Sequence, residues 1–292
     1  MANKSNQVKG IVFLIIAAFG FALMSLFVKL VKLQATQIGV YEIPSTQMVL
    51  FRNGISMIVS FVMVMYIKPR FPREKNTWLL LLLRSTFGTL GMVLFFYSIT
   101  TLNIGDANML NKLSTFFLIG FSALFLKEHV KPYQIIAIVI AFLGSLLIVK
   151  PSFDVSILPY LTSFLAAMFA GAAYTVLRVL GPKTEYYIVV LVFSSFSVIV
   201  LLPYVLLFQY TVMSVTQVWL LIGAGLAATI GQFGTTLAYK YAPAKDISIF
   251  NYTNVIFAAM FGLFFLNEVP DLLSVIGYIV IFFAALYIFK KK

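Results

Sequence analysis

Long apolar runs, separated by short polar or charged connections, fill almost the whole sequence. Each run has roughly the 20 residues that a helix needs to cross a bilayer. Lipid offers no hydrogen-bond partner to the backbone, so apolar runs of this length predict helices. The pattern therefore predicts an all-α integral membrane protein with ten transmembrane helices. Their expected ranges are 11–31, 44–67, 77–99, 104–126, 132–149, 157–179, 186–208, 218–239, 246–266 and 271–289.

The composition excludes two other classes of protein. Of the 292 residues, 62% are hydrophobic and 10% are charged. A soluble domain has roughly 45–50% apolar and about 25% charged residues, so a soluble globule and a disordered chain are both excluded. Ten spanning helices need about 200 residues, which leaves no room for a further soluble domain. The absence of cysteine removes disulfides, thiolate nucleophiles and cysteine-ligated metals from consideration.

The net charge of +12 is distributed unevenly among the connections. With a cytoplasmic N-terminus, 15 of the 21 lysine and arginine residues lie in cytoplasmic segments and 3 in external segments. This positive-inside pattern predicts a multi-pass protein of the cell (plasma or inner) membrane with cytoplasmic N- and C-termini. Nucleic-acid binding needs a basic face on a soluble surface, so no nucleic-acid partner is expected.

The sequence matches itself when it is shifted by 140 residues, without gaps, over the expected helices 104–126 and 132–149. Polar residues are rare in membrane helices, so polar matches carry the most weight. The matched polar pairs are Asp106 with Asp246, Asn111 with Asn251, and Glu128 with Glu268. We therefore expect two repeats, residues 1–150 and 151–292, each with five helices. Five is an odd number, so the second repeat would be inverted, an arrangement that places a substrate site near the midplane and permits alternating access.

The repeated segments resemble the drug/metabolite transporter superfamily in its ten-helix EamA-type branch. The likeness is carried by residues 107–128, ending in Phe-Leu-Lys-Glu, and by residues 247–268, ending in Phe-Leu-Asn-Glu. Many members have proline thirteen residues before this glutamate, whereas the present chain has Thr115 and Val255. The resemblance implies two EamA-like repeats around a central cavity, lined mainly by the first, third, fourth, sixth, eighth and ninth helices. The substrates that it implies are diverse metabolites.

Two polar stripes lie at equivalent positions of the repeats. In the fourth helix, Asn108, Asn111, Lys112 and Thr115 follow the i, i+3, i+4, i+7 spacing of one helix face. The second stripe, in the ninth helix, contains Ser248, Asn251 and Tyr252, with Asn254 nearby. Such stripes cannot face lipid, and Lys112 in the membrane favours a shared cavity. The alternative is hydrogen bonding between helices.

Other polar residues within the spans extend the set of candidates. Arg52 and Lys112 each lie about eight residues from the outer end of a helix, roughly 12 Å deep. They could bracket an anionic or zwitterionic ligand, although Arg52 could equally reach the outer surface, and Arg84 is expected to reach the inner surface. Gln232 lies near the midplane. The candidate substrate-binding residues are Phe21, Arg52, Tyr97, Asn108, Asn111, Lys112, Thr115, Tyr174, Gln232, Asn251, Tyr252 and Asn254.

All nine acidic residues fall in connections or at helix ends. Glu128 and Glu268 are expected to have a structural role, each complementing the positive end of the helix that follows it. No carboxylate lies in mid-membrane, so proton coupling through a buried acid has no evident carrier, with Asp106 the one exception at a helix end.

These patterns predict a secondary transporter that moves a small polar metabolite, such as an amino acid or another zwitterionic or anionic solute, by alternating access. The alternatives are an intramembrane enzyme acting on a lipid-linked substrate and a non-transporting receptor. The chain has one histidine and no paired acids, so no catalytic residue, metal site or cofactor is expected. The expected partners are a small-molecule substrate and membrane lipid, and the protein is expected to be a monomer or homodimer.

Overall fold

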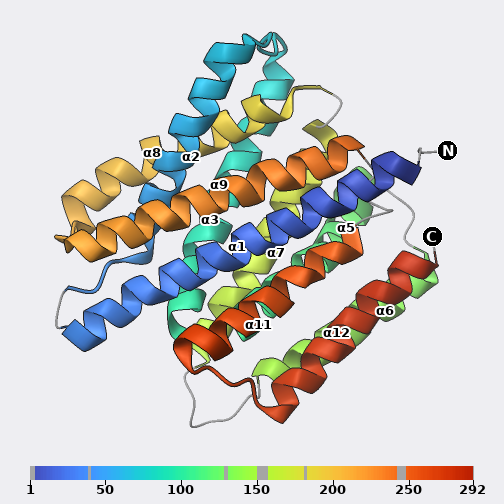
Figure 1. Ribbon diagram of the computed structural model, residues 1–292. Helices are drawn as coiled ribbons and strands as arrows, with labels where there is room; N and C mark the ends of the chain where they lie inside the picture. Colours follow the sequence, from blue (N-terminus) through green and yellow to red (C-terminus); the bar gives the residue numbers. More distant parts are fainter. Residues whose placement is uncertain are drawn as a thin grey trace.

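The computed structural model describes residues 4–38, 41–127, 131–149, 157–180, 183–241 and 248–291, and all regular structure in this part is helical (Figure 1). The α-helices of the part before residue 150 are α1 (Lys4–Ile38), α2 (Ser45–Ile67), α3 (Lys75–Thr101), α4 (Ile104–Asn111), α5 (Ser114–Leu126) and α6 (Pro132–Val149). Those after it are α7 (Leu158–Leu180), α8 (Tyr186–Tyr204), α9 (Val215–Tyr241), α11 (Thr253–Leu266) and α12 (Leu272–Lys290). A π-helical turn, η1 (Val205–Gln209), extends α8, and a 3₁₀ turn, η2 (Ser248–Tyr252), precedes α11.

The apolar helices follow the ten expected spans closely. Seven of them are long and apolar enough to cross a membrane within the described residues. Three more, at 132–148, 250–266 and 272–287, are apolar but shorter. The chain is therefore a multi-pass helical membrane protein.

Two of the expected continuous helices are interrupted. The fourth span, expected over 104–126, divides into α4 and α5, because the amide of Leu113 bonds to the carbonyl of Leu110 in a 3₁₀ turn. The ninth span begins as η2 and becomes α-helical at Thr253, while its expected first residues, 246 and 247, lie outside the described residues. In the repeat alignment, the turn at Lys112 and Leu113 corresponds to the end of η2 at Tyr252 and Thr253.

The end of the seventh span also departs from regular geometry. Pro203 lies near the end of α8, where it has no amide hydrogen to donate to the preceding turn. The helix widens into η1 directly after it, as such local disruptions often do.

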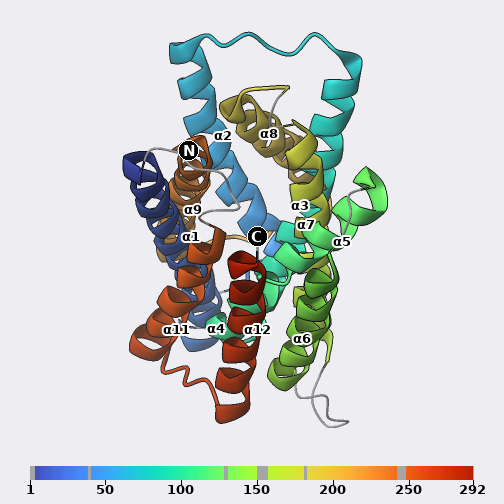
Figure 2. The ribbon, with the colours of Figure 1, turned by 90° about the vertical axis from the view of Figure 1, so that its right-hand side faces the viewer.

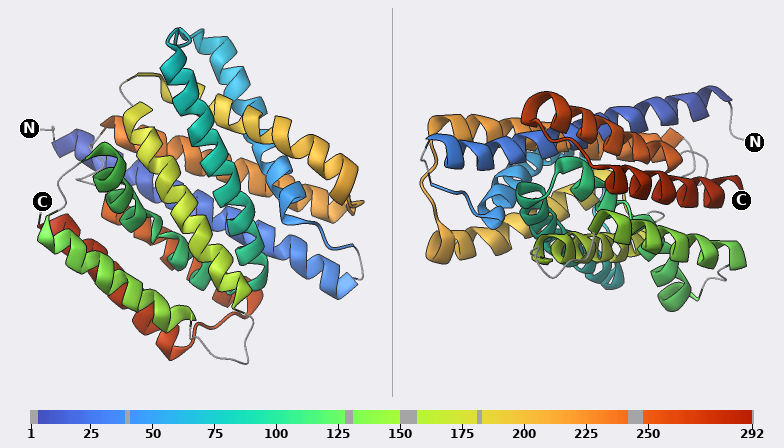
Figure 3. Two further views of the ribbon diagram at one scale, coloured as in Figure 1. Left: turned by 180° about the vertical axis from the view of Figure 1, so that it is seen from behind. Right: turned by 90° about the horizontal axis from the view of Figure 1, so that it is seen from below.

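The most extensive contacts between helices join residues before position 150 to residues after position 156. They pair α1 with α9, α3 with α7, α6 with α12 and α2 with α8. Figure 2 and both views of Figure 3 show α6 and α12 side by side, at one edge of the bundle. The helices before residue 150 and those after residue 156 therefore form one bundle.

Glycines allow the longest of these helices to approach closely. A Cβ on Gly20 of α1 would lie 2.7 Å from the carbonyl oxygen of Ala227 in α9. A Cβ on Gly91 of α3 would lie 3.2 Å from the carbonyl oxygen of Ala166 in α7. Backbones packed this closely are typical of membrane helices, whose interfaces are rich in small residues.

The interior contains polar as well as apolar side chains, and large apolar side chains lie on the exterior. Buried polar side chains include Ser25, Gln47, Arg52 and Asn53, whereas Phe264 is 70% exposed and Trp219 is 68% exposed. Exposed apolar side chains suit a bundle whose surroundings are lipid. The helix α1 begins and α12 ends on the same side of the molecule, the right-hand side in Figure 1.

Candidate functional site

Lys112 lies at the break between α4 and α5, half-buried in the bundle. Its ammonium group makes no ion pair or hydrogen bond to the residues that the structure describes. Asn111, the preceding residue, is also half-buried, and its amide has no partner in the same part of the chain. The break thus presents two adjacent polar side chains that have no side-chain partner in the described part of the chain.

Two other amides of the expected stripes bond to α1. The Asn108 Nδ2 atom donates to Ser25 Oγ at 3.1 Å and to the carbonyl of Ile104 at 2.8 Å. The Asn254 Nδ2 atom donates to the carbonyl of Ala18 at 3.1 Å. For these two residues the geometry favours hydrogen bonding between helices over ligand binding.

Tyr252 lies at the start of α11, only 5% exposed. Its hydroxyl is near Thr115 of α5 and is buried without a hydrogen-bond partner among the described residues. The ring packs edge-on against Phe282 of α12 at a centroid distance of 6.0 Å. Asn251 is half-buried and has a partner within the protein, and the side chain of Ser248 lies outside the described part.

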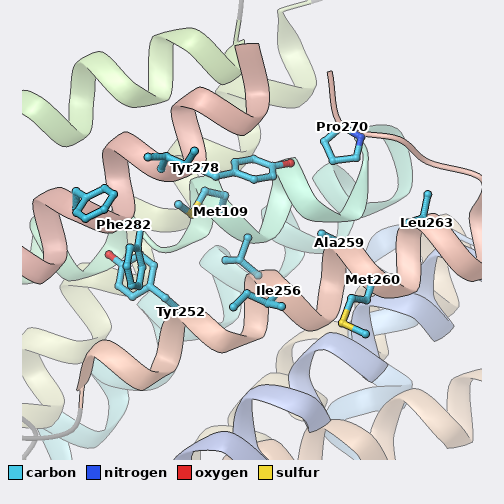
Figure 4. Close-up of a pocket in the computed structure, with 12 residues that line it drawn as sticks. Met109, Tyr252, Ile256, Ala259, Met260, Leu263, Pro270, Tyr278 and Phe282 are labelled. Atoms are coloured by element: carbon cyan, nitrogen blue, oxygen red, sulfur yellow. The ribbon is translucent and has the colours of Figure 1, made fainter. Parts of the chain in front are cut away.

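A pocket of about 520 Å³ opens between α11 and α12, with Met109 of α4 at its base (Figure 4). Its lining is almost wholly apolar, and Tyr252 is the only expected site residue that contributes to it. Beside it, the Tyr278 hydroxyl donates to Asp106 Oδ1 at 2.6 Å, so the Asp106 carboxylate is buried and bonded. This pocket suits an apolar group better than a polar metabolite.

Arg52 points into the bundle and does not reach the outer surface, since it is 1% exposed. One guanidinium nitrogen donates to Asn53 Oδ1, and the other donates to Gln232 Oε1 of α9 at 2.7 Å. The structure therefore brings together Arg52 and Gln232, which lie 180 residues apart in the sequence.

Arg84 corrects an expectation, because it does not extend to the inner surface. Its guanidinium carbon lies 4.6 Å from the ring centroid of Phe193 in α8, and the Arg52 guanidinium lies 6.0 Å from the same ring. The only local signal is Gly88, one turn further along α3, since a Cβ there would collide with Arg84 Nη1. The sequence suggested a different direction for Arg84 and did not single out Phe193 or Asn53. The proximity of these three residues depends on packing between α2, α3 and α8.

Three aromatic candidates have different surroundings. Tyr174 of α7 is 46% exposed. Phe21 packs against the backbone of α9 at Gly231, which gives it a role in helix contact. Tyr97 is half-buried in α3, and nothing in its surroundings points to a ligand.

Glu268 has a different partner from the one that its position in the sequence suggested. Its Oε2 atom accepts from the amide of Ile104 at 2.8 Å, at the start of α4, and its Oε1 atom pairs with Lys29 Nζ at 2.9 Å. Lys29 also donates to the carbonyl of Leu102 at 2.6 Å. The helix after Glu268, α12, is instead capped by Asp271 through the amide of Ser274. Glu128, the repeat equivalent, lies outside the described residues.

The described residues contain no group of three or more histidine or acidic side chains placed to hold a metal ion. Within the same ranges, the ion pairs that form are Lys29 with Glu268 and Lys32 with Glu42. The fold and these interior groups define a multi-pass membrane protein whose helix bundle encloses Arg52, Arg84 and Lys112, which form no ion pair with any residue that the structure describes.

Comparison with known proteins identifies the family. The EamA-like transporter family matches the chain twice, over residues 8–150 and 157–290. The chain belongs to this family and is a membrane transporter.

The relatives include transporters of several kinds. The chain is 29% identical over 285 residues to the pseudopaline exporter CntI of Pseudomonas aeruginosa, covering 97% of this chain and 96% of the exporter. It is 26% identical to solute carrier family 35 member G1 of Homo sapiens, covering 92% and 75% of the two chains. It is 23% identical to the riboflavin transporter of Vibrio cholerae, covering 92% and 89%. A crystal structure with 16% identity aligns at a TM-score of 0.61, over 93% of this chain and 95% of that one, which supports the fold alone.

Proposed function

We propose that this transporter moves a small polar metabolite, anionic or zwitterionic, across the cell membrane by alternating access. The observation that carries the proposal is Lys112, an ammonium group without a partner among the described residues, at a helix break inside the bundle. A charge within a membrane span is energetically costly, and residues that carry one usually mark a substrate or ion pathway. Irregular backbone at membrane depth is tolerated where it lines a cavity.

The pattern of helix contacts supports the inverted repeat on which alternating access depends. If α1, α2 and α3 correspond to α7, α8 and α9, the pairing of α1 with α9 is equivalent to the pairing of α7 with α3. The pairing of α2 with α9 is equivalent in the same way to that of α8 with α3. The helix breaks at Lys112 and Tyr252 add a match in local geometry. Such symmetry would allow the two repeats to exchange conformations.

The Lys29–Glu268 ion pair would form part of the outer gate. It ties α1 to the end of α11, and Glu268 also holds the first amide of α4. Both contacts lie at the end of the bundle that the charge asymmetry assigns to the outside. Opening toward the outside would therefore require these contacts to separate.

The relatives support a substrate with polar groups but do not identify it. One is a pseudopaline exporter and another a riboflavin transporter. The unpaired basic groups favour an anionic or zwitterionic solute for this chain. Cytoplasmic termini remain part of the proposal, supported by the positive-inside pattern, and so does a monomeric or homodimeric state.

The test begins with a thermal-shift screen of a metabolite library against the purified protein. A stabilising metabolite is then labelled, and its flux is measured in reconstituted vesicles. We expect Lys112→Ala and Asn251→Ala to reduce that flux at least tenfold, because each removes a polar group at a helix break. The matched control is Lys127→Ala, since Lys127 is exposed beyond the end of α5. Flux that is unchanged in both site variants would refute the site assignment.

Two other functions predict different outcomes. An intramembrane enzyme would form a product in detergent, where there are no compartments to separate. A receptor would bind the metabolite in vesicles without moving it. Membership of a transporter family favours transport over both.

A further inference from the structure

The second group of basic residues inside the bundle is distinct from Lys112. We call it the arginine cluster: Arg52 and Asn53 of α2, Arg84 of α3, Phe193 of α8 and Gln232 of α9. Both guanidinium groups lie over the Phe193 ring, at 6.0 Å for Arg52 and 4.6 Å for Arg84. Four separate helices therefore converge on one small volume.

The polar contacts within the cluster leave its positive charge uncompensated. Arg52 donates to the amide oxygens of Asn53 and Gln232, which are neutral acceptors. Neither arginine takes part in an ion pair among the described residues. Two buried guanidinium groups around one ring repel each other, and desolvation adds to the cost. An aromatic face offsets only part of this.

The unpaired atoms of the cluster are all hydrogen-bond donors. Arg52 Nε, Asn53 Nδ2, Arg84 Nε and Arg84 Nη1 are buried and have no hydrogen-bond partner among the residues that the structure describes. Buried donors are normally paired, so a group of them at one place indicates an acceptor that binds there. Guanidinium groups present planar forks that match the two oxygens of a carboxylate or the oxygens of a phosphate.

The backbone of α3 leaves the space that Arg84 occupies. A Cβ at Gly88 would collide with Arg84 Nη1 and would lie 2.8 Å from the Phe193 ring. Glycine inside a helix lowers its stability, so Gly88 is best explained by the position of the guanidinium.

From these observations, which rest on the proposed transport function, we propose that the arginine cluster binds an oxoanion group of the transported metabolite. Arg52 and Arg84 provide the charge, Asn53 adds a neutral donor, and Gln232 orients Arg52. Lys112, at the helix break, would contact a different part of the same solute. The substrate class is therefore a metabolite with at least one carboxylate or phosphate group.

The experiment uses the full-length protein in nanodiscs of phosphatidylcholine alone, so that no anionic lipid headgroup can occupy the cluster. Thermal unfolding is followed with acetate, succinate and inorganic phosphate at constant ionic strength, and with uncharged succinamide as a control. We expect at least one oxoanion to raise the unfolding temperature of the wild type in a saturable way, and succinamide to leave it unchanged.

The variants separate binding from structure. Arg84→Gln relieves the repulsion, so without anion it is expected to unfold at or above the wild-type temperature and to lose the response to the oxoanion. Gly88→Ala keeps both charges but displaces Arg84, and is expected to weaken the response at least tenfold. Arg73→Gln, in an exposed loop, and Gly120→Ala, where a Cβ has nothing within 4 Å, are the matched controls.

Each outcome decides the proposal. A wild-type response that Arg84→Gln and Gly88→Ala lack supports it. No response to any of the three anions, or a response that persists in both variants, overturns it. A response that appears only when anionic lipid is removed and returns to none when it is added back identifies the headgroup as the ligand and also overturns it. Oxoanion binding without flux in vesicles would contradict the transport function but not the anion site. Flux without oxoanion binding would contradict the anion site but not the transport function.

Discussion

Amide side chains inside the bundle have two kinds of surroundings. Asn108 and Asn254 bond to α1, whereas Asn111 beside Lys112 has no partner in the described part of the chain. Spacing in the sequence placed Asn108, Asn111 and Lys112 on one face but could not separate them. Whether an amide is paired depends on the residue that the neighbouring helix presents, here Ser25 of α1.

The two bonded amides are expected to affect stability more than transport. Replacing Asn254 with alanine removes its bond to the Ala18 carbonyl, which should lower the free energy of unfolding by about 0.6–2 kcal/mol, as interhelical bonds in membranes do. Unfolding in mixed micelles of increasing denaturing detergent measures this. Asn111→Ala is the matched control, since it removes an unbonded amide. Equal losses of stability in the two variants would contradict the distinction between bonded and unbonded amides.

The direction of Arg84 shows what local sequence could not provide. Its depth in α3 is compatible with a side chain that extends to the inner surface, and that was the expectation. The observed direction depends on Phe193, more than 100 residues later in the sequence, and on the space left at Gly88. Arg52 could be singled out from the sequence, because an arginine this deep in a span is unusual whatever its direction.

At the scale of helices, the sequence predicted where the helices lie but not where a helix is interrupted. Nearly every helix begins and ends within a few residues of its expected range, because apolar length is a local property. The break between α4 and α5 was not expected, since Thr115 replaces the proline that would have signalled it. The break depends on a 3₁₀ turn at Leu113, which no residue type in that stretch enforces.

Close helix packing gives a prediction with a matched pair of variants. Gly20→Ala would place a Cβ 2.7 Å from the Ala227 carbonyl oxygen and push α1 away from α9. We expect a loss of roughly 1–3 kcal/mol in stability, the usual cost of overpacking. Gly120→Ala, with open space around it, should be neutral or slightly stabilising because alanine favours helix. Thermal unfolding in detergent compares them, and similar behaviour of the two would disprove the close approach.

The contacts of Glu268 give a prediction about the outer gate. Glu268→Gln removes the charge that pairs with Lys29 and should make the gate open more often. Because the chain has no cysteine, a single cysteine introduced at the buried Ala107 can report opening through its reaction with an impermeant maleimide. The rate of labelling from outside is expected to rise several-fold.

The control for the gate is Lys32→Gln in the same cysteine background. It breaks the neighbouring pair with Glu42, whose side chain is largely exposed. Labelling that rises equally in both backgrounds would mean that general loosening, and not the gate, had been measured.

At the scale of the molecule, the main contacts join residues before the gap at 150–156 to residues after it. The sequence repeat suggested two units, but which helices pair between them could be learned only from the structure. We predict that a chain ending at residue 150 is digested readily by protease in membranes. When residues 151–292 are supplied as a second chain, protection and metabolite flux should both return. A first half that resists protease by itself would contradict the contact pattern.

This pairing has a consequence for the biogenesis of the protein. The helix α6 (Pro132–Val149) is synthesised well before its main partner, α12 (Leu272–Lys290). The early helices must therefore remain in the bilayer as separate inserted segments, with Arg52 and Lys112 not yet enclosed, until α12 has been synthesised. A deletion of α12 alone would leave α6 without its partner, and quality-control proteases would meet an inserted but unassembled protein.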